Sequence, residues 1–360
     1  MIKYYYKKLI KLIFIVNIIL LTSCGRNEYS YQPYIDPHII FSSIRWWNYD
    51  IFSADIFGEN VSHITKNEWL DFDPAVSSDG SMISFISDRS GNRDIFLIEL
   101  LWIDGYQKWE AKNLQNISNS PGHEWNPKFS PDNDKIIYSY YDAEKDNYDI
   151  YIYDIIEKKH FNLTNRLGYE LYPQFSPDGS YVIFQSWQNG VKEIFFINIL
   201  EKNEINISKN STSNDILPIS NAITPDGQRM VFTSERDGNM NIYSMNINGL
   251  DQKKLTSHDS NDYEPTISND GQRIVFTSER EGNKDIFIMD FDGENLRQLT
   301  TDPSDDWNPK FYPDSRKIVF QSTRDNNWEI YKMNLDGTSQ KNITNNPTTD
   351  FSFTILPLNQ

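Results

Sequence analysis

A short turn phrase recurs six times along the chain and constrains its fold more than any other feature. Each copy is Ser-Pro-Asp-Gly or a close variant, and the six aspartates are separated by 53, 46, 48, 44 and 44 residues. Pro fixes φ, Asp bonds its own backbone and Gly accepts a positive φ, so each phrase predicts a tight hairpin turn. A period of about 40–50 residues indicates one propeller blade per repeat. The aspartates are Asp79, Asp132, Asp178, Asp226, Asp270 and Asp314.

Apolar runs of strand length flank each turn. In the unit around Asp270, residues 273–278 form one run, a Gly-Asn turn follows at 282–283, and residues 285–290 form the next run. A further turn leads to a short run that ends at Thr300. Four strands per unit, joined by hairpins and apolar on both faces, describe a blade packed between two neighbours. The expected fold class is therefore all-β, a β-propeller of four-stranded blades.

The two ends of the chain hold the parts of one further blade. Residues 39–65 match strands two to four of a unit but lack the first strand, and residues 350–355 resemble a first strand with nothing after it. Pairing of the N- and C-terminal strands would close the ring and remove open sheet edges. The favoured count is therefore seven blades, with six as the alternative if the N-terminal fragment pairs elsewhere.

The first two dozen residues differ in composition from the rest. Four lysines precede an apolar run at 12–21, and a Leu-Thr-Ser-Cys sequence ends at Cys24. The run is too short to span a bilayer and has the length of a signal-peptide core. The segment resembles a bacterial lipoprotein signal, which implies that Cys24 is lipidated; the alternative is an ordinary signal peptide with a chance cysteine. The expected domains are a signal peptide at 1–23, a short tether at 24–38 and the propeller at 39–360.

Charge and cysteine content narrow the classes of partner. The formal net charge is −17, and the expected signal peptide carries four lysines, so the mature chain is more acidic still. An acidic surface disfavours nucleic acid and anionic headgroups, and it favours cations or basic partners. Cys24 is the only cysteine, which excludes disulfides within the chain and cysteine-based zinc sites.

A second phrase recurs between two strands of most units. It is Ser-x-Arg-x-Gly-Asn followed by an acid, Ile and an aromatic residue, as at 87–96 and 278–287. Together with the Ser-Pro-Asp-Gly turn, it resembles the TolB-like propeller repeat over roughly residues 39–356. The unit around Asp132 departs from the pattern, since it has Tyr-Tyr-Asp at 140–142. The resemblance implies the fold; the α/β domain that precedes the propeller in TolB is not expected here, so interactions that depend on it are not carried over.

An acid stands just before each expected innermost strand, followed by an apolar residue and usually by Pro two positions later. In a propeller these positions converge on one mouth of the channel, where seven carboxylates would focus negative potential. We therefore expect a binding ring for a cation such as Ca²⁺ or for a basic peptide segment. The alternative is that each acid caps backbone N–H groups in its own loop. The ring comprises Asp71, Glu124, Glu170, Asp215, Asp262, Asp306 and Asp350.

Three other residue types occur at positions where a site could form. His123 and His258 lie in the relevant loops, but two histidines from different blades do not make a metal site. Trp102 and Trp109 lie in the longest connection and are the best candidates among the tryptophans for an exposed recognition loop; the alternative is packing between blades. The arginines of the second phrase are expected to tie neighbouring turns to nearby acids. They are Arg89, Arg236, Arg280 and Arg324.

The sequence predicts a binding protein and not an enzyme, with no cofactor other than a possible Ca²⁺. It has no Gly-x-Ser-x-Gly phrase, no Ser-His-Asp order and no phosphate-cradling glycine loop. The expected function is a monomeric protein–protein interaction scaffold, lipid-anchored in the bacterial cell envelope at the outer membrane, its periplasmic face or the cell surface. Its expected partner is an envelope protein or a basic peptide segment. The alternative is a carbohydrate-binding or lyase-like propeller, in which tryptophans stack on sugars.

Overall fold

Strands, turns and loops make up all of the described residues of this computed structural model. The described residues are 38–45, 47–103, 108–209, 214–218 and 222–356. The chain divides into Met1–Ile35 and Asp36–Gln360, and the fold concerns the second unit. The expected signal peptide, Cys24 and most of the tether lie outside the described residues. Within the described part, no helix has the length and apolar character needed to cross a membrane.

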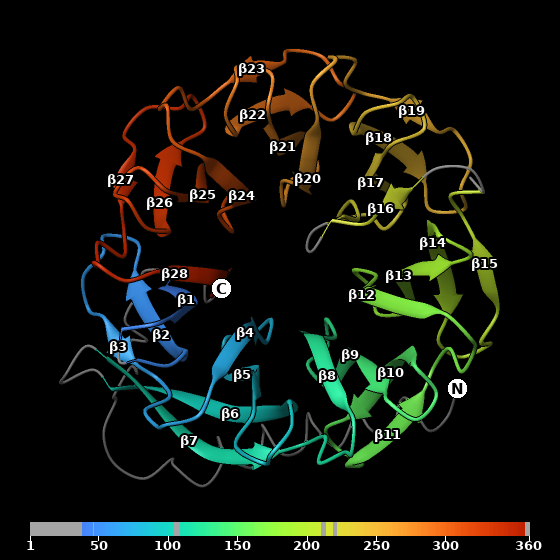
Figure 1. Ribbon diagram of the computed structural model, residues 1–360, viewed down its shortest axis with the longest axis vertical. Coiled ribbons are helices and arrows are strands. Elements are labelled where there is room, and N and C mark those ends of the chain that lie inside the picture. Colours follow the sequence, from blue (N-terminus) through green and yellow to red (C-terminus); the bar gives the residue numbers. More distant parts are fainter. Residues whose placement is uncertain (1–37, 46, 104–107, 210–213, 219–221, 357–360) are drawn as a thin grey trace, which may run out of the picture. The chain divides into compact units, whose positions relative to one another are not determined.

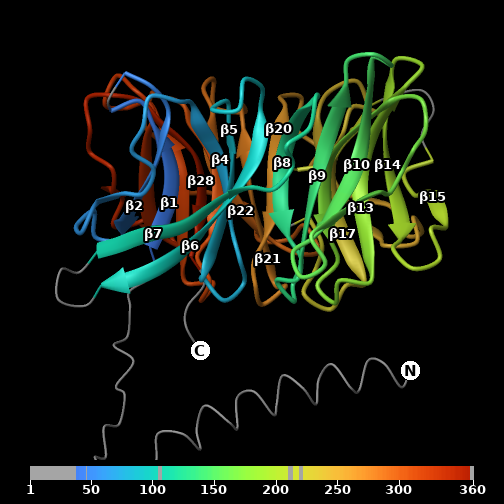
Figure 2. The same cartoon turned by 90° about the horizontal axis from the view of Figure 1, so that it is seen from below.

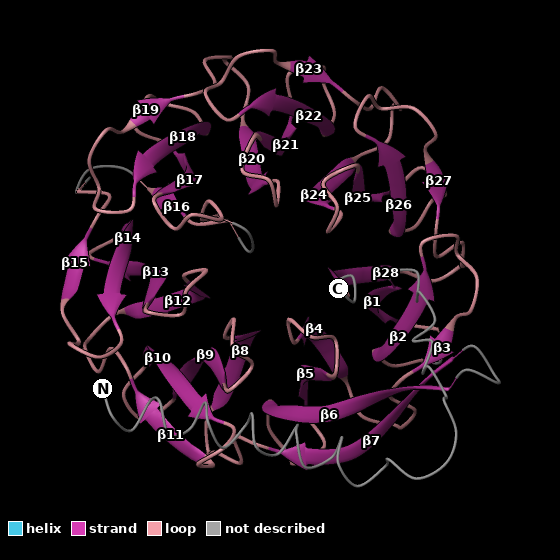
Figure 3. Cartoon of the chain, turned by 180° about the vertical axis from the view of Figure 1, so that it is seen from behind, coloured by secondary structure: helices cyan, strands magenta, loops and turns pink. Residues whose placement is uncertain are grey.

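The strands form antiparallel sets of four that stand around a central axis (Figures 1 and 3). In one set, β20 (Asp262–Ile267) lies next to the axis and β21 (Arg273–Ser278), β22 (Asp285–Asp290) and β23 (Arg297–Gln298) follow outward. The all-β propeller of four-stranded blades is thereby confirmed. Four more sets have the same order: β4 (Asp71–Val76), β5 (Met82–Ser87), β6 (Asp94–Ile103) and β7 (Lys108–Asn116); β8 (His123–Phe129), β9 (Lys135–Asp142), β10 (Asn147–Asp154) and β11 (Lys159–Asn162); β12 (Tyr169–Phe175), β13 (Tyr181–Gln188), β14 (Val191–Asn198) and β15 (Glu204–Asn206); β24 (Asp306–Phe311), β25 (Lys317–Ser322), β26 (Glu329–Asn334) and β27 (Lys341–Asn342).

A further set has a shorter innermost strand. Two other sets share one sheet. The former consists of β16 (Asp215–Ile216), β17 (Arg229–Ser234), β18 (Asn241–Asn246) and β19 (Lys253–Lys254). The sets β8–β11 and β12–β15 are joined by a single parallel residue pair, Tyr148 in β10 with Tyr169 in β12.

The last set combines the two ends of the described chain. β28 (Asp350–Ile355) pairs antiparallel with β1 (His38–Ser43), and β2 (Asp50–Asp55) and β3 (Ser62–His63) complete the order β28-β1-β2-β3. β28 is the innermost strand of this set, the place that the sequence assigned to residues 350–355. β1 begins one residue before the expected start of the propeller.

The hydrophobic core lies between neighbouring sets. The second strand of six sets carries a fully buried phenylalanine at the same position, which packs against an aromatic ring in the third strand, as Phe276 does against Phe287. Burying such a ring contributes about 1.5–3 kcal/mol. In the remaining set the position is taken by Tyr138, whose hydroxyl bonds His160 Nδ1. The six phenylalanines are Phe41, Phe85, Phe184, Phe232, Phe276 and Phe320.

The β6–β7 hairpin is longer than the others and extends beyond the remaining strands in Figure 2. Trp102 and Trp109 face each other across it, with ring centroids 5.2 Å apart, and both contact the ring of His38. Both tryptophans stand on strands and pack against the neighbouring blade, which is the alternative to an exposed recognition loop. They are partly buried because the hairpin folds against the start of β1.

Candidate functional site

The seven predicted ring acids are the first or second residue of the innermost strands, and their side chains are fully buried. Each has 0% exposed surface, and none of them lines the large cavity at the centre of the propeller. The sequence placed them correctly at the ends of the inner strands, but their side chains turn into the blades. They are Asp71, Glu124, Glu170, Asp215, Asp262, Asp306 and Asp350.

Arginines of the second recurring phrase hold most of these acids. Arg324 Nη2 donates to both carboxylate oxygens of Asp306 at 3.0 and 2.9 Å, and its Nε donates to Ser322 Oγ at 2.8 Å. The guanidinium also lies over the ring of Tyr331, 4.6 Å from its centroid. The expected tie between these arginines and nearby acids is confirmed. The same pairing joins Arg89 to Asp71, Arg236 to Asp215, Arg280 to Asp262 and Arg45 to Asp350.

Two blades lack this arginine, and other side chains donate hydrogen bonds to their buried acids. In one, Arg166 reaches Glu170 from the preceding loop, with Nε 3.0 Å from Oε1. In the other, the donors to Glu124 within the described part of the chain are two hydroxyls, Ser118 Oγ at 3.0 Å and Ser120 Oγ. Burial raises the pKa of Glu124 to about 8, the Ser120 hydrogen bond opposes this increase, and the nearby Asp94 carboxylate adds to it. Glu124 is therefore largely protonated at neutral pH.

This placement gives the acids a structural role inside each blade. Where a guanidinium and a serine hydroxyl already occupy a buried carboxylate, a cation must displace them before it can bind. Among the described residues, no group of three His, Cys, Asp or Glu side chains is arranged to hold a metal ion. Binding of Ca²⁺ or of a basic segment by the ring stays a prediction.

A bulge directly after six of the seven acids turns the following residues toward the central axis. The pairing register shifts between Phe72 and Ala75 in β4, and at the equivalent places in β8, β12, β20 and β24. The residue in the bulge has a positive φ although it is not glycine, as for Asn308 at 53°. Such a bulge bends the strand and re-aims its side chains. The bulge residues are Asp73, Asn126, Tyr172, Glu264, Asn308 and Ser352.

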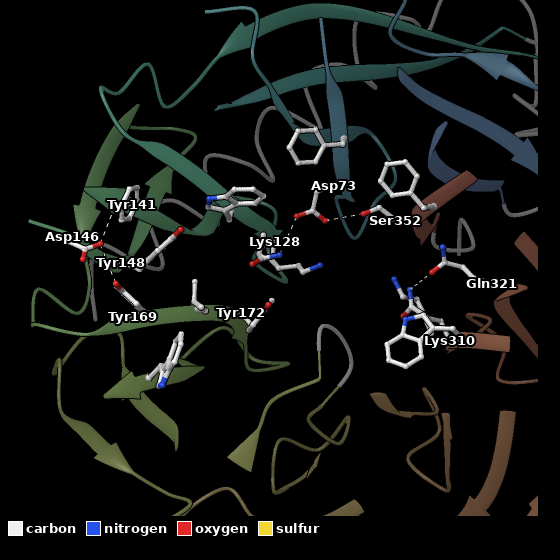
Figure 4. A pocket seen from close by; sticks show the side chains of 18 residues that line it. Asp73, Lys128, Tyr141, Asp146, Tyr148, Tyr169, Tyr172, Lys310, Gln321 and Ser352 are labelled. Atoms are coloured by element: carbon white, nitrogen blue, oxygen red, sulfur yellow. Dashed lines mark hydrogen bonds between the residues drawn. The ribbon is translucent and has the colours of Figure 1, made fainter. Parts of the chain in front are cut away.

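Bulge residues and their apolar neighbours line a central cavity of about 830 Å³ (Figure 4). Five inner strands contribute: β4, β8, β12, β24 and β28. Trp125 in β8 and Trp307 in β24 are part of the lining. Lys284 Nζ lies 4.5 Å from the ring of Trp307, and the guanidinium of Arg93 lies 4.2 Å from that of Trp125. The cavity therefore presents large aromatic surfaces.

One wall of the central cavity is a cluster of tyrosines at the junction of β10 and β12. The ring of Tyr148 lies 4.7 Å from that of Tyr141 and 5.4 Å from that of Tyr169. The hydroxyls of Tyr141 and Tyr169 both donate to Asp146 Oδ1, at 3.1 and 3.2 Å, which raises the pKa of each phenol. Trp187 continues the wall, 5.7 Å from Tyr169. Shared hydrogen bonds and ring contacts hold this wall in one arrangement.

Two lysines line the same cavity, each directly after the proline of its inner strand. Lys310 Nζ donates to the backbone carbonyl of Phe353 at 2.5 Å. Burial and the charge of Lys128 lower the pKa of Lys310 to about 7, while Asp73 and Glu264 oppose this decrease. Lys128 makes no hydrogen bond or ion pair with any described residue.

Comparison with known proteins identifies the repeats. The family described as the TolB beta propeller domain matches residues 106–221, 208–287 and 279–357, together more than half of the chain. The chain belongs to this TolB β-propeller family. TolB of Acinetobacter baumannii is 20% identical, with a TM-score of 0.58 over 90% of this chain and 68% of that one. An oligogalacturonate lyase in complex with manganese is 13% identical, with a TM-score of 0.63 over 85% and 84% of the two chains. At these identities the similarity shows the fold alone.

A curated relative matches a shorter part of this TolB-family chain. An uncharacterized protein of Agrobacterium fabrum is 31% identical over 104 residues, which are 29% of this chain and 32% of the relative. The match thus spans about a third of that protein's length. It adds no activity, because the relative is itself uncharacterized.

In this TolB-family propeller, sequence reasoning predicted a binding ring, which stays untested, and did not predict the lining of the central cavity. It selected the acid, whereas the apolar residue and the bulge residue after it line the central cavity. The signal was available in the acid-apolar-x-Pro spacing, since the residue before proline is restricted and a bulge re-aims side chains. The two loop histidines instead accept backbone N–H groups, His123 from Arg93 and His258 from Ser260.

Proposed function

We propose that this chain is a membrane-anchored lipoprotein of the bacterial cell envelope whose propeller binds an extended segment of another envelope protein. The central cavity carries the proposal: it is about 830 Å³ in volume and has tryptophans and tyrosines on its walls. Trp and Tyr are enriched in binding hot spots because each buries a large area for few rotatable bonds. Anchoring rests on the sequence around Cys24, where acyl chains would hold the protein at a membrane.

The walls of the cavity suit a bound segment because they are already in place. Tyr141, Tyr148 and Tyr169 contact one another and share Asp146, so few side chains must be ordered when a ligand binds. Buried arginine–acid pairs fix the inner strands β4, β24 and β28, which carry other lining residues, whereas serine hydroxyls hold Glu124 in β8. The proposed role is non-catalytic: the propeller recognises and holds its partner.

A carbohydrate ligand is the second candidate, and one observation favours it. Trp125, Trp187 and Trp307 all line the central cavity, and flat aromatic faces are the surfaces on which sugar rings stack. A glycan array probed with the full chain distinguishes the two functions. Saccharide binding that disappears in a Trp307→Ala variant would support this candidate and count against a protein segment.

The direct experiment is capture of a partner from envelope extract with the full chain in detergent. We expect the wild type to recover one protein stoichiometrically, and a Trp125→Ala/Trp307→Ala variant to recover about a tenth as much, since a hot-spot tryptophan contributes 2 kcal/mol or more. Trp47→Ala is the matched control, because Trp47 is 99% exposed and does not line the cavity. Equal recovery by the cavity variant would show that binding occurs elsewhere.

A further inference from the structure

The central cavity of this acidic protein contains two lysines that face the same space. The formal net charge of the chain is −17, yet Lys128 in β8 and Lys310 in β24 both line the cavity (Figure 4). Lys128 also lines a second cavity, of about 290 Å³, bordered by the turns that contain Pro131 and Pro177. It therefore lies at the border of both cavities.

Neither lysine is required by the construction of the blade. Gln174 occupies the equivalent position in β12, where its Nε2 donates to the carbonyl of Pro218 in the next blade. Thr266 does the same in β20, donating to the carbonyl of Pro309 at 3.0 Å. Lys310 makes the corresponding bond to Phe353, so a neutral side chain could perform this structural task. The two positive charges need another explanation.

The surroundings of the lysines favour an incoming anion. Lys128 has no partner among the described residues, and its charge disfavours the protonated form of Lys310. The nearest acid in the lining, Asp73, already accepts hydrogen bonds from Asn126 Nδ2 and Ser352 Oγ, each at 3.3 Å. A carboxylate placed near both ammonium groups would relieve their repulsion and form charge-assisted hydrogen bonds.

We propose that the central cavity recognises an acidic peptide segment, with an Asp or Glu carboxylate held by Lys128 and Lys310 and a neighbouring aromatic side chain packed on the wall around Trp125 and Tyr148. This inference rests on the proposed function and specifies its partner. It reverses the sign expected from net charge, because the local charge of the cavity and not the overall charge of the chain contacts the ligand. The aromatic wall beside the lysines argues for a ring next to the acid.

The pH dependence of binding provides an independent signature. The charged groups that face Lys310 are Lys128 in β8, Asp73 in β4 and Glu264 in β20. Because burial lowers the pKa of Lys310 to about 7, its charge is present below that pH and is lost as the pH rises above it. Affinity for an acidic segment should therefore fall by about tenfold between pH 6 and pH 8.

The test selects ligands without assuming their sequence. A phage-displayed library of random heptapeptides is selected on the full chain in detergent at pH 6, and enriched peptides are synthesised with a fluorophore for anisotropy measurements. We expect the enriched peptides to carry Asp or Glu beside an aromatic residue. Replacing that acid by its amide, or introducing Lys128→Gln or Lys310→Gln, should weaken binding by about tenfold.

Control variants and outcomes separate this inference from the proposed function. Lys128→Gln and Lys310→Gln keep the hydrogen-bonding capacity seen at Gln174, so we expect both variants to fold. The matched control is Lys112→Met on the outer strand β7, which should bind like the wild type. One outcome overturns the inference and leaves the proposed function standing. In that outcome, a Trp125→Ala variant no longer binds the peptides, but the peptides bind equally well after the amide or glutamine substitutions or show no pH dependence. If every enriched peptide binds the Trp125→Ala variant as well as the wild type, the proposed function and the further inference both fail.

Discussion

At the scale of single residues, the Ser-x-Arg phrase has a physical explanation. The serine hydroxyl accepts the arginine Nε, the arginine Nη2 binds the buried acid, and the guanidinium lies over an aromatic ring. A buried charge pair adds little net stability over apolar residues, but removing one partner leaves an unpaired buried charge. Each arginine therefore matters because its acid is already buried.

Replacing Arg324 by Met should lower the free energy of unfolding by about 3–5 kcal/mol, since the Asp306 carboxylate would remain buried without its cation. Urea denaturation followed by fluorescence measures the change. The additional substitution Asp306→Asn should recover part of the loss. Arg316→Met, at an exposed turn position, is the matched control and should cost less than about 0.5 kcal/mol. Similar losses for the two arginines would refute the structural role.

Glu124 should make stability fall as the pH rises. Its pKa is about 8 in the folded protein against 4.5 as the ordinary value, so the folded state binds more protons between these pH values and its stability decreases across that range. Glu124→Gln should remove this part of the decrease, as measured by denaturation at pH 6 and pH 9. The same substitution at Glu110, which is half exposed, should leave the pH profile unchanged. A wild-type profile that matches that of Glu124→Gln would contradict the raised pKa.

The sequence predicts only some of these residue-level features. It identified the arginines, the acids and the departure at residues 140–142, because these are patterns of residue type. It did not predict that the acids are buried or that Glu124 is protonated, because both depend on how deeply the start of an inner strand is covered. It also missed Arg166, which reaches Glu170 from outside the recurring phrase.

At the scale of elements, the asparagine that ends the second recurring phrase connects several blades to the next. The side chain of Asn283 donates to the carbonyls of Asp302 and Ser304, both at 2.9 Å, in the loop that leads into β24. Asn239 and Asn327 make the equivalent pairs of bonds. The repeat predicted the strands and turns, but the function of this asparagine and the positive φ of the bulge residues require three-dimensional contacts that periodicity does not contain.

Asn283→Ala should lower the free energy of unfolding by about 1–3 kcal/mol, because two backbone carbonyls lose their donor. Asn203→Ala should change it by less than about 0.5 kcal/mol, because the Asn203 side chain is exposed and, among the described residues, donates only to Glu201. Hydrogen exchange should show the largest local loss of protection in the loop before β24. An unchanged loop would mean that the asparagine does not hold it.

At the scale of the whole propeller, the two chain ends meet in one sheet. β28 pairs with β1, and Arg45 from the N-terminal part binds Asp350 from the C-terminal part at 3.0 Å. Phe353 in β28 is 2% exposed and packs in a cluster with Phe41 and Val319. The sequence predicted this pairing because each end lacked what the other contained.

Phe353→Ala should therefore destabilise the protein by about 3–5 kcal/mol, the cost of deleting a buried ring, although it lies seven positions from the last residue. Phe320→Ala, in the interior of a continuous set, is the reference variant. Comparable losses in urea denaturation support closure by the C-terminal strand. A negligible loss for Phe353→Ala would show that β28 frays and that the remaining strands hold the fold.

The central claim is that the cavity at the propeller axis contacts a partner, and site-specific photocrosslinking in living cells tests it most directly. Benzoylphenylalanine placed at Phe72, in the cavity lining, should crosslink to one envelope protein. The same amino acid at Leu200, which is 92% exposed in an outer turn, should give no defined product. A crosslink from Leu200 with none from Phe72 would contradict the account.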